Sequence, residues 1–332
     1  MSTGKPIAGL SVDLDNQWSY MKTHGDPGWE SFPSYLGVVV PRILNFLRER
    51  NLTVTFFIVG QDAALEKNGA ALNAVAAAGH EVGNHSFHHE IWLHLRPERH
   101  IDADVAQAEE HIAEVTGRTA VGFRGPGYGC SETLLRVLAR RGYLYDASTL
   151  PSFLGPLARA YYFLTARLSP DEKRDRSQLF GTLRDGLRPL RPYRWRLDVE
   201  GQGNGVLEIP VTTMPIFKIP MHVSYVLYLS MFSETLALSY FKMALALCRL
   251  TGVQPSLLLH PLDFLGCDDV DELSFFPAMG LSSERKIQVV SAVLRWYVER
   301  YSVLPLQQYA REMARVSRVP MVSPSFDTPP VP

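Results

Sequence analysis

The chain has 332 residues, of which 46% are hydrophobic, and a formal net charge of -1. A chain of this length can bury a large core, so the fold needs no disulfide or structural metal to hold it together. The near-neutral charge excludes a general attraction to nucleic acid, and no nucleic-acid partner is expected. Three cysteines without Cys-x-x-Cys spacing, and no apolar run of signal-peptide length after Met1, predict a cytoplasmic protein.

Short apolar segments rich in β-branched and aromatic residues alternate with segments of helical spacing. Strands are predicted at 7–14, 52–59, 80–84, 121–124, 206–211 and 256–259, and helices over 36–50, 63–78, 97–116 and 131–141. This alternation predicts a parallel sheet with crossover helices, closed as a barrel. The rhythm breaks over 150–205, and the Pro/Ser-rich tail at 318–332 is expected to be disordered.

Polar residues stand where the predicted strands end. They are Asp13, Asp15, His85, Arg124, Asp146 and His260. In parallel α/β folds the functional site lies at the C-terminal ends of the strands. We therefore expect these side chains, which are far apart in the sequence, to share one site.

Two histidines and one aspartate have the chemistry of a catalytic metal site. His85 and His89 are four residues apart, so on a helical turn they would share a face, and Asp15 can complete a triad. Three protein ligands leave a position open for water, as in catalytic zinc sites. Zinc is the expected metal, and cobalt, nickel or iron also suits this ligand set. On their own, two histidines at this spacing are more often turn or surface residues; the Asp-x-Asp pair favours metal binding.

Residues around the expected metal are candidates for proton transfer and charge stabilisation. Asp13 is the candidate base, and Arg124 can hold it ionised through a charge-assisted hydrogen bond. A backbone N–H near Tyr128, in the Arg-Gly-Pro-Gly-Tyr segment, can stabilise an oxyanion.

His260 is the candidate general acid, and this role requires a carboxylate that keeps its ring protonated. Asp146 and Asp263 are both candidates for that carboxylate, and the sequence does not choose between them.

Together these segments resemble the NodB-homology polysaccharide deacetylases (carbohydrate esterase family 4), in a divergent branch with an Asp-x-Asp first motif. The five motifs of that family correspond in order to Ser11-Val12-Asp13-Leu14-Asp15; His85, Ser86 and His89; Arg124, Pro126 and Tyr128; Tyr145-Asp146-Ala147-Ser148; and Leu257, Leu259 and His260. The resemblance implies a distorted (β/α)7 barrel over residues 1–310, interrupted by an insertion at 150–205.

The same resemblance implies a metal-dependent hydrolase that removes an N-acyl group, acetyl or formyl, from an amino sugar. It implies that Asp15, His85 and His89 bind the metal and that Asp13 and His260 act as base and acid. It further implies that Arg124 orients the base and Tyr128 supplies the oxyanion N–H. Asp146, in the fourth motif, is counted with the catalytic group.

The insertion is strongly basic. Residues 153–197 contain ten Lys/Arg and four acidic residues, a local net charge of +6. Phe180, Leu183, Leu187 and Leu190 recur at helical spacing, which predicts a basic amphipathic helix in peripheral contact with the inner membrane face. A substrate linked to polyprenyl phosphate would fit this location. The alternative is that the segment is a lid packed on the barrel.

Two other functions compete with the deacetylase. One is an allantoinase-like C–N hydrolase acting on a small cyclic amide, which would need an enclosed pocket and no membrane-facing insertion. The other is a catalytically inactive sugar-binding barrel, which the full set of candidate catalytic groups disfavours.

Overall fold

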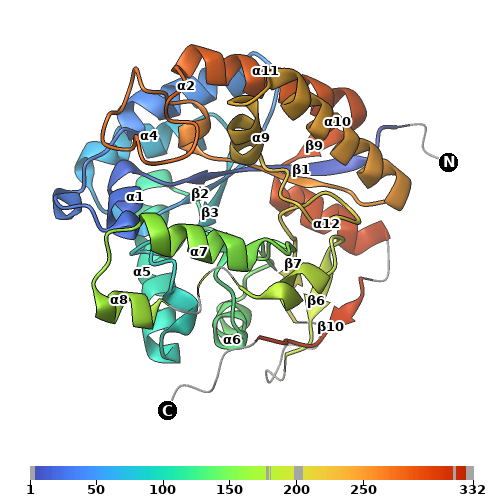
Figure 1. Ribbon diagram of the computed structural model, residues 1–332. Helices are drawn as coiled ribbons and strands as arrows, with labels where there is room; N and C mark the ends of the chain where they lie inside the picture. The colour runs from blue at the N-terminus through green and yellow to red at the C-terminus, as the bar shows by residue number, and fades with distance from the viewer. Residues whose placement is uncertain (1–3, 177–178, 180, 198–204, 317–318, 327–332) are drawn as a thin grey trace.

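The computed structural model describes residues 4–176, 179, 181–197, 205–316 and 319–326. Its centre is one curled sheet with helices arranged around it (Figure 1). Among the described residues, parallel strands run in the order β7-β5-β4-β3-β2-β1-β8. These strands are β1 (Ile7–Leu14), β2 (Thr55–Ile58), β3 (Glu81–Asn84), β4 (Gly122–Phe123), β5 (Tyr145–Asp146), β7 (Leu207–Glu208) and β8 (Ser256–Leu259). The predicted α/β barrel is confirmed in this form.

Short strands extend the sheet, and a pair of hydrogen bonds draws its ends together. β6 (Tyr193–Trp195) is antiparallel to β7, β10 (Met321–Val322) pairs with β6, and β9 (Ser302–Leu304) pairs with β1. Thr212, beyond β7, donates its N–H to the carbonyl of Ser256 at 3.0 Å and accepts from the Ser256 N–H at 2.8 Å. These bonds join the end of the sheet at β7 to the opposite end at β8.

The helices cover the sheet. They are α1 (Gln17–His24), α2 (Leu36–Arg48), α3 (Gly60–Ala63), α4 (Glu66–Ala77), α5 (Glu98–Thr116), α6 (Glu132–Arg140), α7 (Gly155–Thr165), α8 (Pro170–Asp175), α9 (Val223–Ser230), α10 (Glu234–Thr251), α11 (Ser283–Arg300) and α12 (Leu306–Val316). In α2 the buried residues recur at helical spacing, with Leu36, Val39 and Ile43 on the side that faces the core. β1 is buried on both faces from Ala8 to Leu14, as expected of a central parallel strand.

The insertion does not contain the amphipathic α-helix expected around residues 180–190. Leu183–Leu187 forms a short 3₁₀ helix (η4), capped by Thr182 and Asp185. Gly186 lies inside the segment, and Pro189 restricts Arg188 to an extended backbone with ψ of 150°. The glycine and the proline therefore prevent the longer α-helix that the spacing of the apolar residues predicted. Phe180 lies outside the described residues.

The tail is ordered where the structure describes it, so the prediction of disorder is wrong for residues 319–326. The N–H of Arg194 donates to Pro320 at 2.8 Å, and that of Arg196 donates to Val322 at 2.9 Å. The ring of Phe326 packs on Trp195, with centroids 5.5 Å apart. The tail is held by backbone hydrogen bonds to the edge strand β6, and this pairing cannot be predicted from the composition of the tail. Residues 327–332 lie outside the described part.

Candidate active site

The register of the sheet brings the predicted residues to one end of the barrel. Val12 pairs with Leu259, so Asp13 and His260 are the next residues on neighbouring strands. Likewise Asn84 pairs with Phe123, which places His85 beside Arg124. The strand ends that carry Asp13, His85, Arg124 and His260 therefore lie at one end of the sheet.

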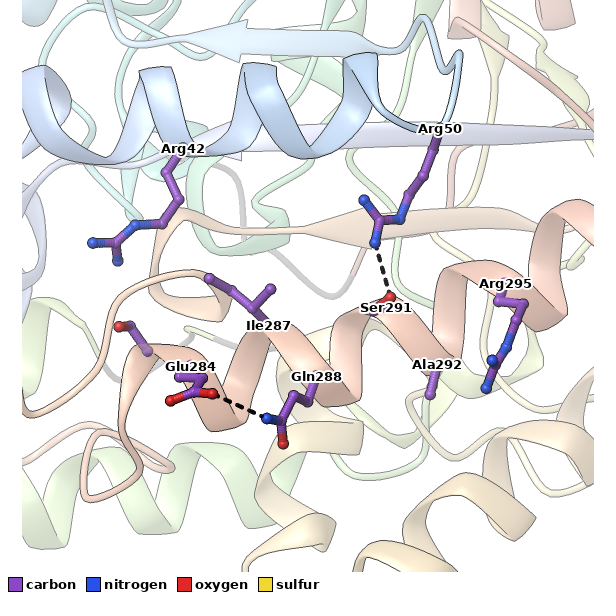
Figure 2. A pocket seen from close by; sticks show the side chains of 9 residues that line it. Arg42, Arg50, Glu284, Ile287, Gln288, Ser291, Ala292 and Arg295 are labelled. Carbon is purple, nitrogen blue, oxygen red and sulfur yellow. Dashed lines mark hydrogen bonds between the residues drawn. The ribbon is translucent and has the colours of Figure 1, made fainter.

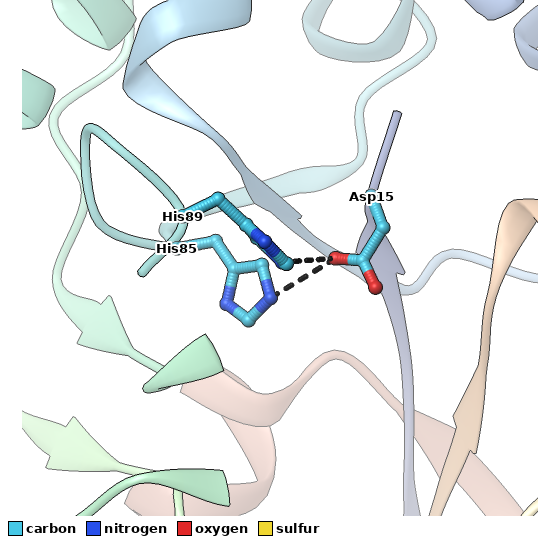
Figure 3. Close-up of side chains that lie close together, drawn as sticks. All are labelled: Asp15, His85 and His89. Atoms are coloured by element: carbon cyan, nitrogen blue, oxygen red, sulfur yellow. Dashed lines mark hydrogen bonds and ion pairs between the residues drawn. The ribbon is translucent and has the colours of Figure 1, made fainter. Parts of the chain in front are cut away.

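Asp15, His85 and His89 converge on one point (Figure 3). One carboxylate oxygen of Asp15, Oδ1, lies 3.1 Å from Nε2 of His85 and 3.0 Å from Nε2 of His89. All three residues are buried, and their potential ligand atoms lie within 4.8 Å of one another. Although burial opposes it, the two histidines hold the pKa of the Asp15 carboxyl well below its usual range.

The hydrogen bonds of His85 show that this group suits a cation. Nδ1 of His85 lies 2.7 Å from the carbonyl oxygen of Arg124, and a carbonyl only accepts, so Nδ1 carries a proton. In the neutral ring Nε2 is then a lone pair that faces the Asp15 carboxylate. At this distance either a proton on Nε2 or a bound cation must lie between the two groups. A carbonyl behind the distal nitrogen is also the usual support of a metal-binding histidine.

The histidine segment is not a helical turn, so that part of the prediction is wrong. Ser86 and His89 have φ angles of 64° and 49°, in the left-handed region. The turn is held by Asp104 of α5, whose carboxylate accepts the N–H groups of Phe87 at 2.8 Å and His88 at 3.1 Å. Sequence reasoning missed Asp104. Its signal was one acidic residue on the apolar face of α5, three residues after the buried Ile101.

Arg124 and Asp13 form a buried ion pair near Asp15, His85 and His89. Nη1 of Arg124 donates to Asp13 Oδ1 at 2.7 Å and to Ser11 Oγ at 2.9 Å, and Nε donates to the Ala147 carbonyl at 2.9 Å. The guanidinium also lies 4.5 Å from the ring centre of Phe57. These contacts fix the Asp13 carboxylate, whose other oxygen lies 3.9 Å from His260 Nε2.

Tyr128 occupies a left-handed position with a φ angle of 62°, in the 3₁₀ turn η3 (Pro126–Tyr128). Its backbone N–H donates to the Gly125 carbonyl at 3.1 Å. In this conformation the amide expected to stabilise an oxyanion already has a partner. Burial, reinforced by Asp13, raises the pKa of the Tyr128 phenol, so its hydroxyl keeps its proton near the candidate base.

Asp146 does not contact His260 in the described structure, which corrects its assignment as a candidate partner of that ring. Its carboxylate accepts from Ser148 Oγ at 2.5 Å, and Ser148 accepts the N–H of Gly125 at 2.8 Å. Burial and the neighbouring Asp146 raise the pKa of Glu208 well above its usual range. Asp146 thus belongs to a buried polar cluster that supports the loop after β4.

His260 instead contacts residues of α9 and of the 3₁₀ turn η5 (Pro261–Asp263). Nδ1 of its ring lies 3.0 Å from Ser224 Oγ, and its backbone N–H donates to Asp263 Oδ2 at 2.8 Å. The ring of His222 packs edge-on against it, with centroids 6.1 Å apart. Of the two carboxylates considered, Asp263 is the one beside His260.

A cavity of about 580 Å³ elsewhere is lined by residues of α2 and α11 (Figure 2). Two of its three arginines are engaged: Arg42 binds both carboxylate oxygens of Asp269, and Arg50 donates to Ser291 Oγ at 2.8 Å. None of the candidate catalytic residues lines it.

Comparison with known proteins points the same way as the geometry. A family model described as polysaccharide deacetylase matches residues 26–145. A peptidoglycan deacetylase of Helicobacter pylori is 25% identical over 45% of this chain and 52% of its own length. The peptidoglycan deacetylase-like protein FGM2 of Gibberella zeae is 32% identical over 46% of this chain and 45% of its own. The chain therefore spans about half the length of these curated relatives.

The fold is also that of a solved protein. A crystal structure described as a putative polysaccharide deacetylase from Mycobacterium smegmatis superposes over 100% of both chains, with a TM-score of 0.59 at 18% identity. At this identity the likeness concerns the fold.

Proposed function

We propose that the chain is a polysaccharide deacetylase, as the family model matched over residues 26–145 and the curated relatives suggest, and that it hydrolyses the N-acyl amide of an amino sugar. The observation that carries the proposal is the convergence of Asp15, His85 and His89 next to the Arg124–Asp13 ion pair. These three residues would hold one divalent metal, zinc in our proposal, with cobalt, nickel or iron as fitting substitutes. When bound, the metal would polarise the amide carbonyl and lower the pKa of a bound water.

The surrounding residues supply the proton transfers. Arg124 donates a charge-assisted hydrogen bond to Asp13 and fixes its carboxylate, which can take a proton from the attacking water as a general base. The C–N bond breaks when the leaving nitrogen receives a proton, which His260 can give from Nε2. That nitrogen lies 3.9 Å from Asp13, so acid and base face a common space. The oxyanion donor proposed at Tyr128 requires its N–H to turn away from Gly125.

For the substrate we propose an N-acetylated or N-formylated amino sugar. The names of the relatives favour a sugar of the peptidoglycan type. A polyprenyl-phosphate-linked sugar is the second form that we propose, on the strength of the insertion. There, Leu164 and Leu187 are 86% and 75% exposed among the basic residues of 153–197. Apolar side chains among cations suit peripheral contact with the cytoplasmic face of an anionic membrane.

Within the described residues, no helix is both long and apolar enough to span a bilayer. The proposed contact is thus a surface one, tested by sedimentation with vesicles of phosphatidylglycerol and phosphatidylcholine. Binding that depends on phosphatidylglycerol and weakens in Leu164→Ser/Leu187→Ser supports it, and equal recovery in the supernatant with and without vesicles refutes it.

The enzymatic proposal is tested by metal content together with acetate release from N-acetylglucosamine oligomers. Wild type should hold about one transition-metal ion per chain, and His85→Ala and His89→Ala should lose both metal and activity. His100→Ala is the matched control, because His100 is an exposed histidine near the start of α5. Wild type that binds no metal after reconstitution would contradict the metal site. Turnover of allantoin without acetate release would favour the cyclic-amide alternative.

A further inference from the structure

Ser224 lies between the candidate acid and a buried carboxylate, although it comes from a different element than either. It is the second residue of α9, whereas His260 precedes the turn η5 after β8 and Asp263 is the last residue of that turn. Its Oγ is 3.0 Å from Nδ1 of His260. The Asp263 carboxylate is 1% exposed and accepts the backbone N–H of His260 at 2.8 Å.

The position of Ser224 has no separate structural use in the helix. A serine near a helix N-terminus commonly bonds to a backbone N–H. The N-cap of α9 is His222, which makes no side-chain cap, and Ser224 Oγ lies beside His260 Nδ1 instead.

The charge of Asp263 decides the direction of the hydrogen bonds. Burial raises the pKa of the Asp263 carboxyl, while His260, its backbone N–H and the Ser224 hydroxyl favour the ionised form. In its ionised form Asp263 can only accept, and the single proton of the Ser224 hydroxyl would then point to Asp263. A lone pair of Ser224 Oγ is then left to accept a hydrogen bond from the Nδ1–H group of His260.

We propose that Ser224 is a positioning residue that relays the charge of Asp263 to His260 and keeps the proton of the neutral ring on Nδ1. The proposal rests on the proposed deacylation, in which His260 gives its Nε2 proton to the leaving nitrogen. The ring that remains carries a proton on Nδ1 only, which is the form that Ser224 stabilises. In this proposal the Ser224 hydroxyl links the Asp263 carboxylate to the His260 ring through hydrogen bonds.

The groups that face His260 come from three elements. Asp13 approaches from β1, His222 and Ser224 from α9, and Asp263 from η5. His222 is held neutral, because burial and the neighbouring His260 lower its pKa to about 3. Asp13 faces Nε2 and Ser224 faces Nδ1, so removing Ser224 changes the balance between the two ring nitrogens without touching the metal residues.

The test reads the tautomer directly, in protein labelled with ¹⁵N-histidine and compared as wild type, Ser224→Ala and Ser224→Thr. The His260 signals are assigned by their loss in His260→Gln. We expect neutral His260 of wild type and Ser224→Thr to carry its proton on Nδ1, and Ser224→Ala to shift toward the Nε2-protonated form. Ser230→Ala is the matched control, since Ser230 lies in the same helix and bonds to Leu227.

Kinetics give a second readout. Ser224→Ala should lower kcat roughly 10- to 100-fold with KM and metal content unchanged, and Ser224→Thr should recover most of the loss. Asp263→Asn should move the tautomer as Ser224→Ala does, and Asp146→Asn should not. An unchanged tautomer in Ser224→Ala would overturn the proposal. The tautomer is measured without substrate, so it separates failure of the relay from absence of deacetylase activity.

Discussion

Nη1 of Arg124 donates to Oδ1 of Asp13 at 2.7 Å in an ion pair whose side chains are 0% and 5% exposed. The pair ties the loop after β4 to the end of β1, two positions from the proposed metal residue Asp15. Removal of one partner from such a pair leaves a buried charge without compensation. A buried Asp13 carboxylate would destabilise the fold if it had no partner. Arg124 compensates its charge and also holds it in position as the candidate base.

We predict that Arg124→Lys weakens catalysis more than it weakens metal binding. A lysine ammonium can reach Asp13 but cannot also match the bonds of Nε to Ala147 and Nη1 to Ser11. We expect a loss of roughly 2 kcal/mol in unfolding free energy and a fall in kcat of about 100-fold. Metal content should persist, because His85 is held by the backbone carbonyl of residue 124.

Thermal unfolding, metal analysis and acetate release on the same samples check this prediction. Arg136→Lys is a suitable control, since Arg136 forms an exposed pair with Glu132 on the outer face of α6. Full activity in Arg124→Lys would show that the second guanidinium contacts are dispensable.

The parts of the site that were predictable from sequence are those fixed by strand ends. Asp13, His85, Arg124 and His260 each stand at the end of an apolar segment, and the parallel register carries them to a common edge. Their types were also informative, because few arrangements bring two imidazoles and a carboxylate together without a cation. For these four residues, their position after an apolar segment and their side-chain chemistry were enough to predict that they belong to the site.

The parts that were not predictable depend on contacts between distant elements. Ser224 meets His260 only because α9 crosses the end of β8, and helical spacing says nothing about that crossing. Asp146 ends a strand as expected, yet its side chain turns to Ser148 and the neighbourhood of Glu208. The side chain at the end of a strand can thus point either into the site or into the protein interior behind it. The left-handed Ser86 and His89 likewise depend on Asp104, which lies in another element.

Asp104 leads to a second prediction, that Asp104→Asn lowers metal affinity roughly 10- to 100-fold. The carboxylate accepts the N–H groups of Phe87 and His88, and an amide of the same shape puts a donor against one of them. The turn that aims His89 at Asp15 should then lose its fixed form. Competition with a chromophoric chelator measures the affinity.

Asp102→Asn is the control for this change, because Asp102 lies in the same helix and pairs with Arg141 at its outer face. Equal affinity in Asp104→Asn and wild type would mean that the metal residues themselves fix the turn.

The third prediction concerns a buried carboxylate next to the site. Burial raises the pKa of Asp62 to about 7, although Asn16 and Trp18 donate hydrogen bonds to it. In the unfolded chain an aspartate titrates near pH 4. Between about pH 4 and 7 the unfolded state therefore releases a proton that the native state retains. Asp62 thus makes the native protein less stable as the pH rises through this window, with no further loss above it.

Asp62→Asn should remove this dependence. Its Oδ1 can keep the bonds from Asn16 and Trp18, and its amide group replaces Oδ2, which has no hydrogen-bond partner among the described residues. In chelator-treated protein we compare the unfolding free energy of the variant with that of wild type. We expect this difference to shift in favour of the variant by about 2 kcal/mol from pH 5 to pH 7, and to stay constant above pH 7. Chemical denaturation at a series of pH values measures this difference. Asp171→Asn, at an 82% exposed side chain, should show no such trend. A gap between Asp62→Asn and wild type that is the same at every pH would mean that Asp62 ionises normally, so that the polar groups around it offset its burial in full.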